Sequence, residues 1–148
     1  MDTNNTQPRP IRVMIVDDEP NLREAWESLV NSQPDMQVVE SLEDANDLAT
    51  VVDALKPDVV LLDLLMPGKD PLAAVREVTV SNPETRIIVY TNFSHPGLAR
   101  RVFEVGASAL TGKLEDPMSI IDLLRRTALE PVPLPREEIT LGQAAPAN

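Results

Sequence analysis

The sequence has no cysteine and few aromatic residues, with one tryptophan, one tyrosine and two phenylalanines among its 148 residues. Without cysteine, neither a disulfide nor a thiolate metal site can form. Basic residues are also scarce: 13 Lys and Arg stand against 24 Asp and Glu, which gives a formal net charge of −11. This charge argues against non-specific binding to nucleic acid, because such binding relies on lysine and arginine facing phosphates.

Long apolar runs are absent as well. No run approaches the length of about 20 residues that a membrane-spanning helix needs. Residues 1–10 are polar and lack the apolar segment of a secretory signal. We therefore expect a cytoplasmic chain that makes no membrane contact. Its length and its hydrophobic content of 43% suit one folded domain with a real core.

What the chain does contain is a short apolar strand that ends on a carboxylate. Four apolar residues, Val59 to Leu62, are typical of a strand buried on both faces in a parallel sheet. Asp63 follows directly, and the pair Pro67-Gly68 then predicts a turn. Ligands bind at the carboxyl edge of the strands in open α/β sheets, so Asp63 is a candidate site residue. A strand-end aspartate is also common as a helix cap or loop residue, so the rest of the chain must decide.

Strand and helix patterns alternate five times along the chain. We predict strands at residues 11–16, 36–40, 59–62, 86–91 and 107–111, and helices at about 20–32, 41–55, 71–82, 94–106 and 116–128. Ser41 with Asp44 resembles a capping box that opens the second helix. The alternation favours a doubly wound, five-stranded parallel sheet in the order 2-1-3-4-5, with helices on both faces.

Five polar residues follow or end these strands and form one set. Asp17 and Asp18 follow the first strand, Asp63 ends the third, Thr91 ends the fourth and Lys113 follows the fifth. In the order 2-1-3-4-5 the first and third strands are neighbours, so three carboxylates would converge in one crevice. Crowded carboxylates need a cation, and Mg²⁺ takes such ligands together with phosphate. A carboxylate can also act as a nucleophile and form an aspartyl-phosphate.

These residues lie in patterns that resemble the receiver domain of bacterial two-component response regulators, closest to the LuxR-type branch. The matching segments are Val16-Asp17-Asp18-Glu19-Pro20, Asp63-Leu64-Leu65-Met66-Pro67-Gly68, Tyr90-Thr91, Gly106-Ala107 and Gly112-Lys113. The resemblance covers about residues 10 to 130 and implies a flavodoxin-like receiver fold. We therefore expect a flexible tail at residues 1–10, a receiver domain at 11–130 and a proline-rich tail or linker at 131–148.

The resemblance also implies a role for each site residue. Asp63 would accept a phosphoryl group from a sensor histidine kinase in a Mg²⁺-dependent reaction. Asp17 and Asp18 would hold Mg²⁺ together with Asp63 and the backbone carbonyl of Leu65. Thr91 and Lys113 would contact the phosphoryl group and transmit its presence.

Three positions depart from the family pattern. Leu110 stands where the family has an aromatic switch residue, Leu114 follows the lysine in place of a proline, and Pro71 replaces a glycine. Tyr90 cannot substitute for the missing aromatic residue, because neighbours on a strand point to opposite faces. We therefore expect the signal to leave through Thr91 and Lys113, by a shift of residues 92–96 and the helix that follows.

Two alternatives stay open beside the signalling phosphoacceptor, which is not an enzyme with a substrate of its own. One is a pseudo-receiver that serves only as an interaction module. The other is a Mg²⁺-dependent phosphohydrolase acting through an aspartyl-phosphate, although such enzymes need an acid where this chain has Leu65. The expected partners are a sensor histidine kinase and an output domain or downstream protein, and a homodimer stays open. The tail after residue 130 is too short for a helix-turn-helix domain, so DNA binding would require a longer chain.

Overall fold

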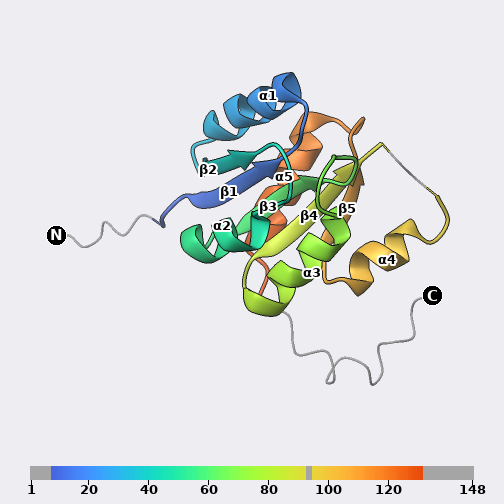
Figure 1. Cartoon of the computed structure of the whole chain (residues 1–148). Helices are drawn as coiled ribbons and strands as arrows, with labels where there is room; N and C mark the ends of the chain where they lie inside the picture. Colours follow the sequence, from blue (N-terminus) through green and yellow to red (C-terminus); the bar gives the residue numbers. More distant parts are fainter. Residues whose placement is uncertain (1–7, 93–94, 132–148) are drawn as a thin grey trace.

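The computed structural model describes residues 8–92 and 95–131. Five parallel strands form one sheet in the order β2-β1-β3-β4-β5, and helices cover both faces (Figure 1). The strands are β1 (Ile11–Val16), β2 (Met36–Leu42), β3 (Val59–Asp63), β4 (Arg86–Thr91) and β5 (Ala109–Gly112). The helices are α1 (Pro20–Asn31), α2 (Leu48–Leu55), α3 (Pro71–Ser81), α4 (Leu98–Glu104) and α5 (Pro117–Ala128). This is the doubly wound fold that the sequence predicts.

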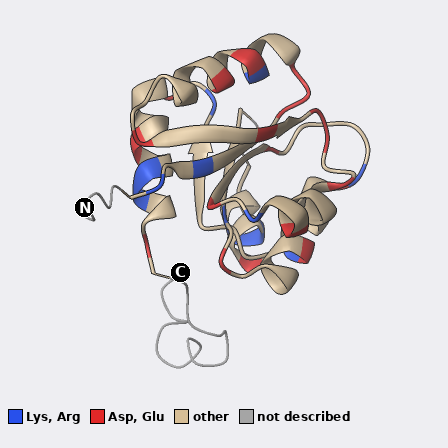
Figure 2. Ribbon diagram, turned by 90° about the vertical axis from the view of Figure 1, so that its left-hand side faces the viewer, with Lys and Arg blue, Asp and Glu red and all other residues tan. Residues whose placement is uncertain are grey.

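The acidic residues that give the chain its negative charge are spread over helices and loops on several sides of the molecule (Figure 2). Within the residues that the structure describes, no helix is both long enough and apolar enough to cross a membrane.

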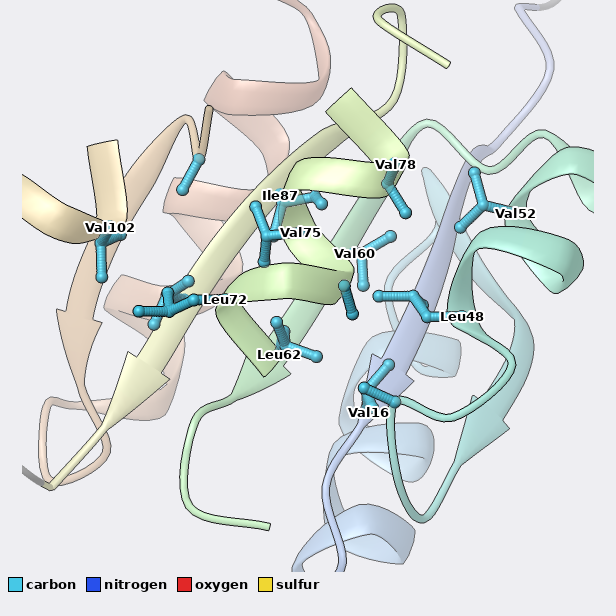
Figure 3. Close-up of a cluster of buried hydrophobic side chains, with 14 of the residues drawn as sticks. Val16, Leu48, Val52, Val60, Leu62, Leu72, Val75, Val78, Ile87 and Val102 are labelled. Carbon is cyan, nitrogen blue, oxygen red and sulfur yellow. The ribbon is translucent and has the colours of Figure 1, made fainter. Parts of the chain in front are cut away.

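The core has two halves, one on each face of the sheet, because side chains alternate along each strand. Val60 and Leu62 of β3 point to the face that α2, α3 and α4 cover, where the buried residues are aliphatic (Figure 3). Val59 and Leu61 point to the face that α1 and α5 cover, where Trp26 and Tyr90 join the aliphatic residues. All five residues of β3 are buried. The central strand is thus apolar throughout except for its last residue, Asp63.

The pairing register brings the carboxyl ends of the strands to one edge. Val16 of β1 pairs with Leu62 of β3, so that Asp17 follows at the level of Asp63. On the other side Asp63 pairs with Tyr90 of β4. The last residues of β4 and β5, Thr91 and Gly112, also pair with each other. The five predicted site residues therefore reach the same edge of the sheet.

Proline and acid pairs start three of the helices. Glu19 precedes Pro20, and its side chain accepts a hydrogen bond of 3.1 Å from the Leu22 backbone N–H. Asp70 precedes Pro71 and accepts a 3.1 Å bond from Leu72 in the same way. Pro71, which departs from the family pattern, thus stands at a first helical position, where a missing N–H costs nothing. Asp116 precedes Pro117 at the start of α5, as predicted, but makes no side-chain cap bond.

The predicted capping box at Ser41 is wrong. Strand β2 continues to Leu42, whose carbonyl accepts a 3.0 Å hydrogen bond from the backbone N–H of Asp17. The Ser41 hydroxyl instead donates to the carboxylate of Glu27 on α1. Helix α2 starts later than expected, after Asp47, because pairing with β1 extends β2 past the local cap signal.

Other boundaries differ by a few residues. Helix α4 begins at Leu98, after Gly97 at a φ of 93°, rather than at the predicted residues 94–96. Strand β5 begins and ends later than the predicted 107–111. Of the segments named in the sequence analysis, residues 1–7, 93–94 and 132–148 lie outside the described residues, so the two tails stay predictions.

Candidate functional site

Three carboxylates converge at the carboxyl edge of β1 and β3. Asp17, Asp18 and Asp63 each offer one oxygen, and these oxygens all lie within 4.8 Å of one another. Asp17 is fully buried and Asp63 is 2% exposed, whereas Asp18 faces solvent. The predicted convergence of the three acids is what the structure contains.

Lys113 joins two of these acids. Its Nζ lies 3.1 Å from Oδ2 of Asp63 and 3.2 Å from Oδ2 of Asp17. Burial acts to lower the pKa of Lys113, but the hydrogen bond to Asp63 and the charge of Asp17 outweigh it, so the pKa is raised. The lysine is therefore charged at neutral pH and offsets part of the acidic crowding.

Asp63 remains poorly stabilised as an anion. Burial raises its pKa, and the opposing effects of the Leu65 backbone N–H, which donates to Oδ1 at 3.2 Å, and of Lys113 do not cancel this. The charge of Asp17 adds to the upward shift. One lysine does not balance the charge of three carboxylates, so a further cation would stabilise the cluster. Carboxylate oxygens are hard donors, which Mg²⁺ prefers. The residues present therefore fit a divalent cation, with the exposed Asp18 on the solvent side.

Tyr90 is a neighbour of the site that sequence reasoning missed. It is 1% exposed, and its hydroxyl donates to Oδ2 of Asp17. Its ring lies 5.1 Å from Nζ of Lys113 and meets the ring of Trp26 edge-on at 6.1 Å. Burial, together with the hydrogen bond to Asp17, raises the pKa of the Tyr90 phenol, so the hydroxyl stays protonated and donates. Strand alternation could have indicated this position, because it puts Tyr90 on the face opposite Thr91, which is the face that Trp26 covers.

Thr91 of β4 and Leu110 of β5 lie on the face of the sheet opposite Tyr90, along a groove. Thr91 is 4% exposed, and its carbonyl accepts a 3.3 Å hydrogen bond from the backbone N–H of Lys113. The groove has a volume of about 260 Å³ and is lined by Thr91, His95, Leu98, Ala99, Leu110, Thr111 and Gly112. Leu110 is half-buried and packs against the aliphatic half of the core. The position that lacks the family's aromatic residue thus borders an open groove next to Thr91.

Leu65 contacts Asp63 through its backbone N–H, whereas the predicted metal ligand is its carbonyl oxygen. Its backbone N–H donates to Asp63, and its side chain is 54% exposed. The role of its carbonyl as a metal ligand stays a prediction, as do the roles of the other site residues.

Fold and site together define a class: a doubly wound α/β module with an acidic pocket at the point where the strand order reverses. Comparison with known proteins agrees. The family model of the response regulator receiver domain matches residues 13–125. The chain therefore belongs to the response regulator receiver domain family of two-component systems, as its sequence patterns indicate.

Relatives and solved structures support this placement. The uncharacterized transcriptional regulatory protein YxjL of Bacillus subtilis is 34% identical over 121 residues, which cover 80% of this chain and 54% of that protein. The transcriptional regulatory protein LiaR of the same species is 30% identical over 115 residues, covering 78% of this chain and 54% of the relative. The chain thus spans about half the length of the curated relatives that it matches.

Among solved structures, a two-component response regulator of the LuxR family from Aurantimonas sp. SI85-9A1 superimposes with a TM-score of 0.75 and 29% identity. The match covers 80% of this chain and 85% of that one. The response regulator domain of Thermotoga maritima CheB gives a TM-score of 0.75 at 25% identity, covering 83% of this chain and all of that one. The resemblance to the LuxR-type branch is therefore confirmed.

Proposed function

We propose that this chain is the phosphoacceptor receiver of a two-component signalling system, with Asp63 as the acceptor. The observation that supports this best is the contact of Lys113 with both Asp63 and Asp17 beside a third carboxylate, Asp18. A single ammonium among three acids suits a site that takes up a divalent cation and then a phosphoryl group.

In the proposed reaction a carboxylate oxygen of Asp63 attacks the phosphorus of a phosphohistidine on a sensor histidine kinase. A P–O bond to Asp63 forms and the P–N bond breaks. The electron pair of the broken bond stays on the histidine nitrogen, which takes up a proton. Asp17, Asp18, Asp63 and the backbone carbonyl of Leu65 would hold Mg²⁺, which supplies positive charge to the phosphoryl oxygens when bound.

Thr91 and Lys113 have the binding and signalling roles in this proposal. Lys113 already contacts Asp63 and would follow the phosphoryl oxygens as an ammonium donor. Thr91 would offer its hydroxyl from the neighbouring strand. The chain promotes only its own phosphorylation and dephosphorylation, and it signals through altered protein contacts.

Domain roles and partners complete the proposal. Residues 11–130 act as the receiver, residues 1–10 as a tail and residues 131–148 as a tail or linker, in the cytoplasm. The partners are a sensor histidine kinase and an output domain or downstream protein, and phosphorylation could favour a homodimer. DNA would be contacted only by a further domain of a longer chain.

Acetyl phosphate with Mg²⁺ tests the proposal. Intact-mass spectrometry should detect one added phosphoryl group on the wild type and none on Asp63→Asn. Asp58→Asn is the matched control, since Asp58 lies directly before the same strand that Asp63 ends. We expect Asp58→Asn to be phosphorylated like the wild type. An equal mass gain in Asp63→Asn would exclude Asp63 as the acceptor.

Phosphorylation and phosphatase assays on the wild type separate the two alternatives. A wild type that gains no mass with acetyl phosphate or with a phosphorylated kinase would be a pseudo-receiver. A chain that turns over a generic phosphate ester would be a phosphohydrolase. Such an enzyme uses a general acid two residues after its nucleophile, and the side chain there is the exposed and apolar Leu65.

A further inference from the structure

Tyr90 is an uncharged side chain whose hydroxyl reaches an acid of the candidate metal cluster. It lies on β4 directly before Thr91, but it points to the face covered by α1 and α5. Its hydroxyl donates to Oδ2 of Asp17, which is fully buried. The hydroxyl therefore acts on the buried acid from the side of the sheet that α1 and α5 cover.

The Tyr90 ring is held in place by two neighbours. The Trp26 ring on α1 packs against it edge-on, with 6.1 Å between the ring centroids and 87° between the planes. Nζ of Lys113 lies 5.1 Å from its centroid, close enough for a cation–π contact. Both neighbours contact the ring, so a phenylalanine would keep these two ring contacts.

The two oxygens of Asp17 are used differently. Oδ2 accepts from the Tyr90 hydroxyl and lies 3.2 Å from Nζ of Lys113. Oδ1 accepts one hydrogen bond in the described part of the chain, 2.9 Å long, from the backbone N–H of Glu19. Since a carboxylate oxygen can accept two such bonds, Oδ1 keeps a lone pair for a cation. Tyr90 and a cation therefore use different oxygens and need not compete.

We propose that Tyr90 is a positioning residue for cation binding: its hydroxyl fixes the rotation of the Asp17 carboxylate and keeps Oδ1 available to Mg²⁺. This inference rests on the proposed function, because it assumes that the acidic cluster takes up Mg²⁺. Mutating a residue that hydrogen-bonds to a metal ligand typically weakens metal affinity by roughly 10–100-fold. Without the hydroxyl, Asp17 can rotate and present Oδ1 to the cation only part of the time.

Mg²⁺ titration by calorimetry tests the proposal with two single-hydroxyl deletions. Tyr90→Phe should weaken Mg²⁺ binding about tenfold, the low end of the range for such partners. Thr85→Val is the matched control: Thr85 is also buried and donates to the Pro57 carbonyl at 3.0 Å, just before the other end of β4. It should bind Mg²⁺ as the wild type does.

Thermal unfolding in the absence of Mg²⁺, measured on the same proteins, separates positioning from a purely structural role. A Tyr90→Phe protein that loses stability but keeps the wild-type Mg²⁺ affinity would overturn the proposal. So would tighter binding, which would mean that the hydroxyl competes with the cation. If the wild type itself failed to bind Mg²⁺, the proposed function would fall together with this inference. Normal binding by the wild type and unchanged binding by Tyr90→Phe would overturn the inference alone.

Discussion

Strand β3 carries an aspartate at each end, and the two are stabilised in opposite ways. Asp58, directly before the strand, accepts bonds of 2.9 and 3.0 Å from the Arg9 guanidinium and one of 2.9 Å from the Arg12 backbone N–H. Burial acts to raise the pKa of Asp58, but these donors outweigh it and the pKa is lowered. The pKa of Asp63, at the other end, is raised by burial despite Lys113.

The difference separates an acid that serves the fold from one that is available for chemistry. Asp58 accepts from the Arg9 guanidinium and the Arg12 backbone N–H, and it has no acidic contact among the described residues. Asp63 and Asp17 both contact Lys113, and a carboxylate oxygen of Asp63 lies within 4.8 Å of one of Asp18. Perturbed carboxylates of this second kind cluster at functional sites. The contrast therefore predicts which substitutions affect ligands and which affect stability.

The largest expected effect is on cation binding. Asp18→Ala should weaken Mg²⁺ affinity tenfold or more, about 1.4 kcal/mol, because a site of a few carboxylates completed by water cannot spare one. Asp58→Ala should leave the affinity unchanged. Calorimetric titration of both variants measures this, and unchanged affinity in Asp18→Ala would remove it from the metal site.

Next in size is an opposite pair of effects on unfolding. Asp58→Ala should destabilise the metal-free protein by about 1–2 kcal/mol, because the Arg12 N–H loses its acceptor; the Arg9 pair adds little, since Arg9 is 63% exposed. Asp63→Asn should stabilise the same protein, because it removes a buried charge from an acidic cluster. Urea unfolding without Mg²⁺ gives both values. A loss of stability in Asp63→Asn would contradict the contrast between the two acids.

A smaller effect is the pH dependence of stability that comes from Asp35, which lies at the same end of the sheet as Asp58. The hydrogen bond from Arg125 lowers the pKa of Asp35, at the start of β2, so the folded state binds this proton less readily than the unfolded chain. The stability from this pair is therefore present above about pH 4 and is lost as the pH falls through the folded-state pKa. Asp35→Asn should cost less than about 1 kcal/mol at pH 7, since both side chains are partly exposed.

The control for that prediction is the same variant at low pH. In urea unfolding the difference in stability between wild type and Asp35→Asn should shrink as the pH is lowered below about 4, because the contribution of the ion pair is lost as the pH falls through the folded-state pKa. A difference that persisted at low pH would assign the effect to packing.

The placement of the site could be predicted because it depends on local signals. Strands β1, β3 and β4 are short, mostly apolar runs that a polar residue ends or follows, β5 ends directly before Lys113, and parallel pairing then aligns the ends. The Ser41 prediction failed because a cap motif is local, whereas β2 is extended by tertiary pairing with β1. Tyr90 lies on the face opposite Thr91, as strand alternation predicts. Its contact with Asp17 depends on the distance between β1 and β4 across β3, and no local pattern encodes that distance.

The smallest expected effect concerns how a phosphoryl group on Asp63 would alter the opposite face of β4. Leu110 has no ring to swing into the groove beside Thr91, so the two states should differ little in packing there. A bound group shifts an equilibrium only by its differential interaction with the two states, and Thr91 and Lys113 are the residues that would contact it. Beryllofluoride with Mg²⁺, as a phosphoryl mimic, should therefore change hydrogen exchange in residues 92–112.

Three proteins test this route. The change in exchange should persist in Leu110→Ala and disappear in Thr91→Ala, with the wild type as reference. Amides near Asp58, at the far end of β3, should exchange equally with and without the mimic and so serve as the internal control. If Leu110→Ala abolished the change while Thr91→Ala retained it, the signal would leave through the groove and not through Thr91. The contrast between the two ends of the sheet would survive that result, but the route from Asp63 to α4 would have to run through the packing of Leu110 against the core.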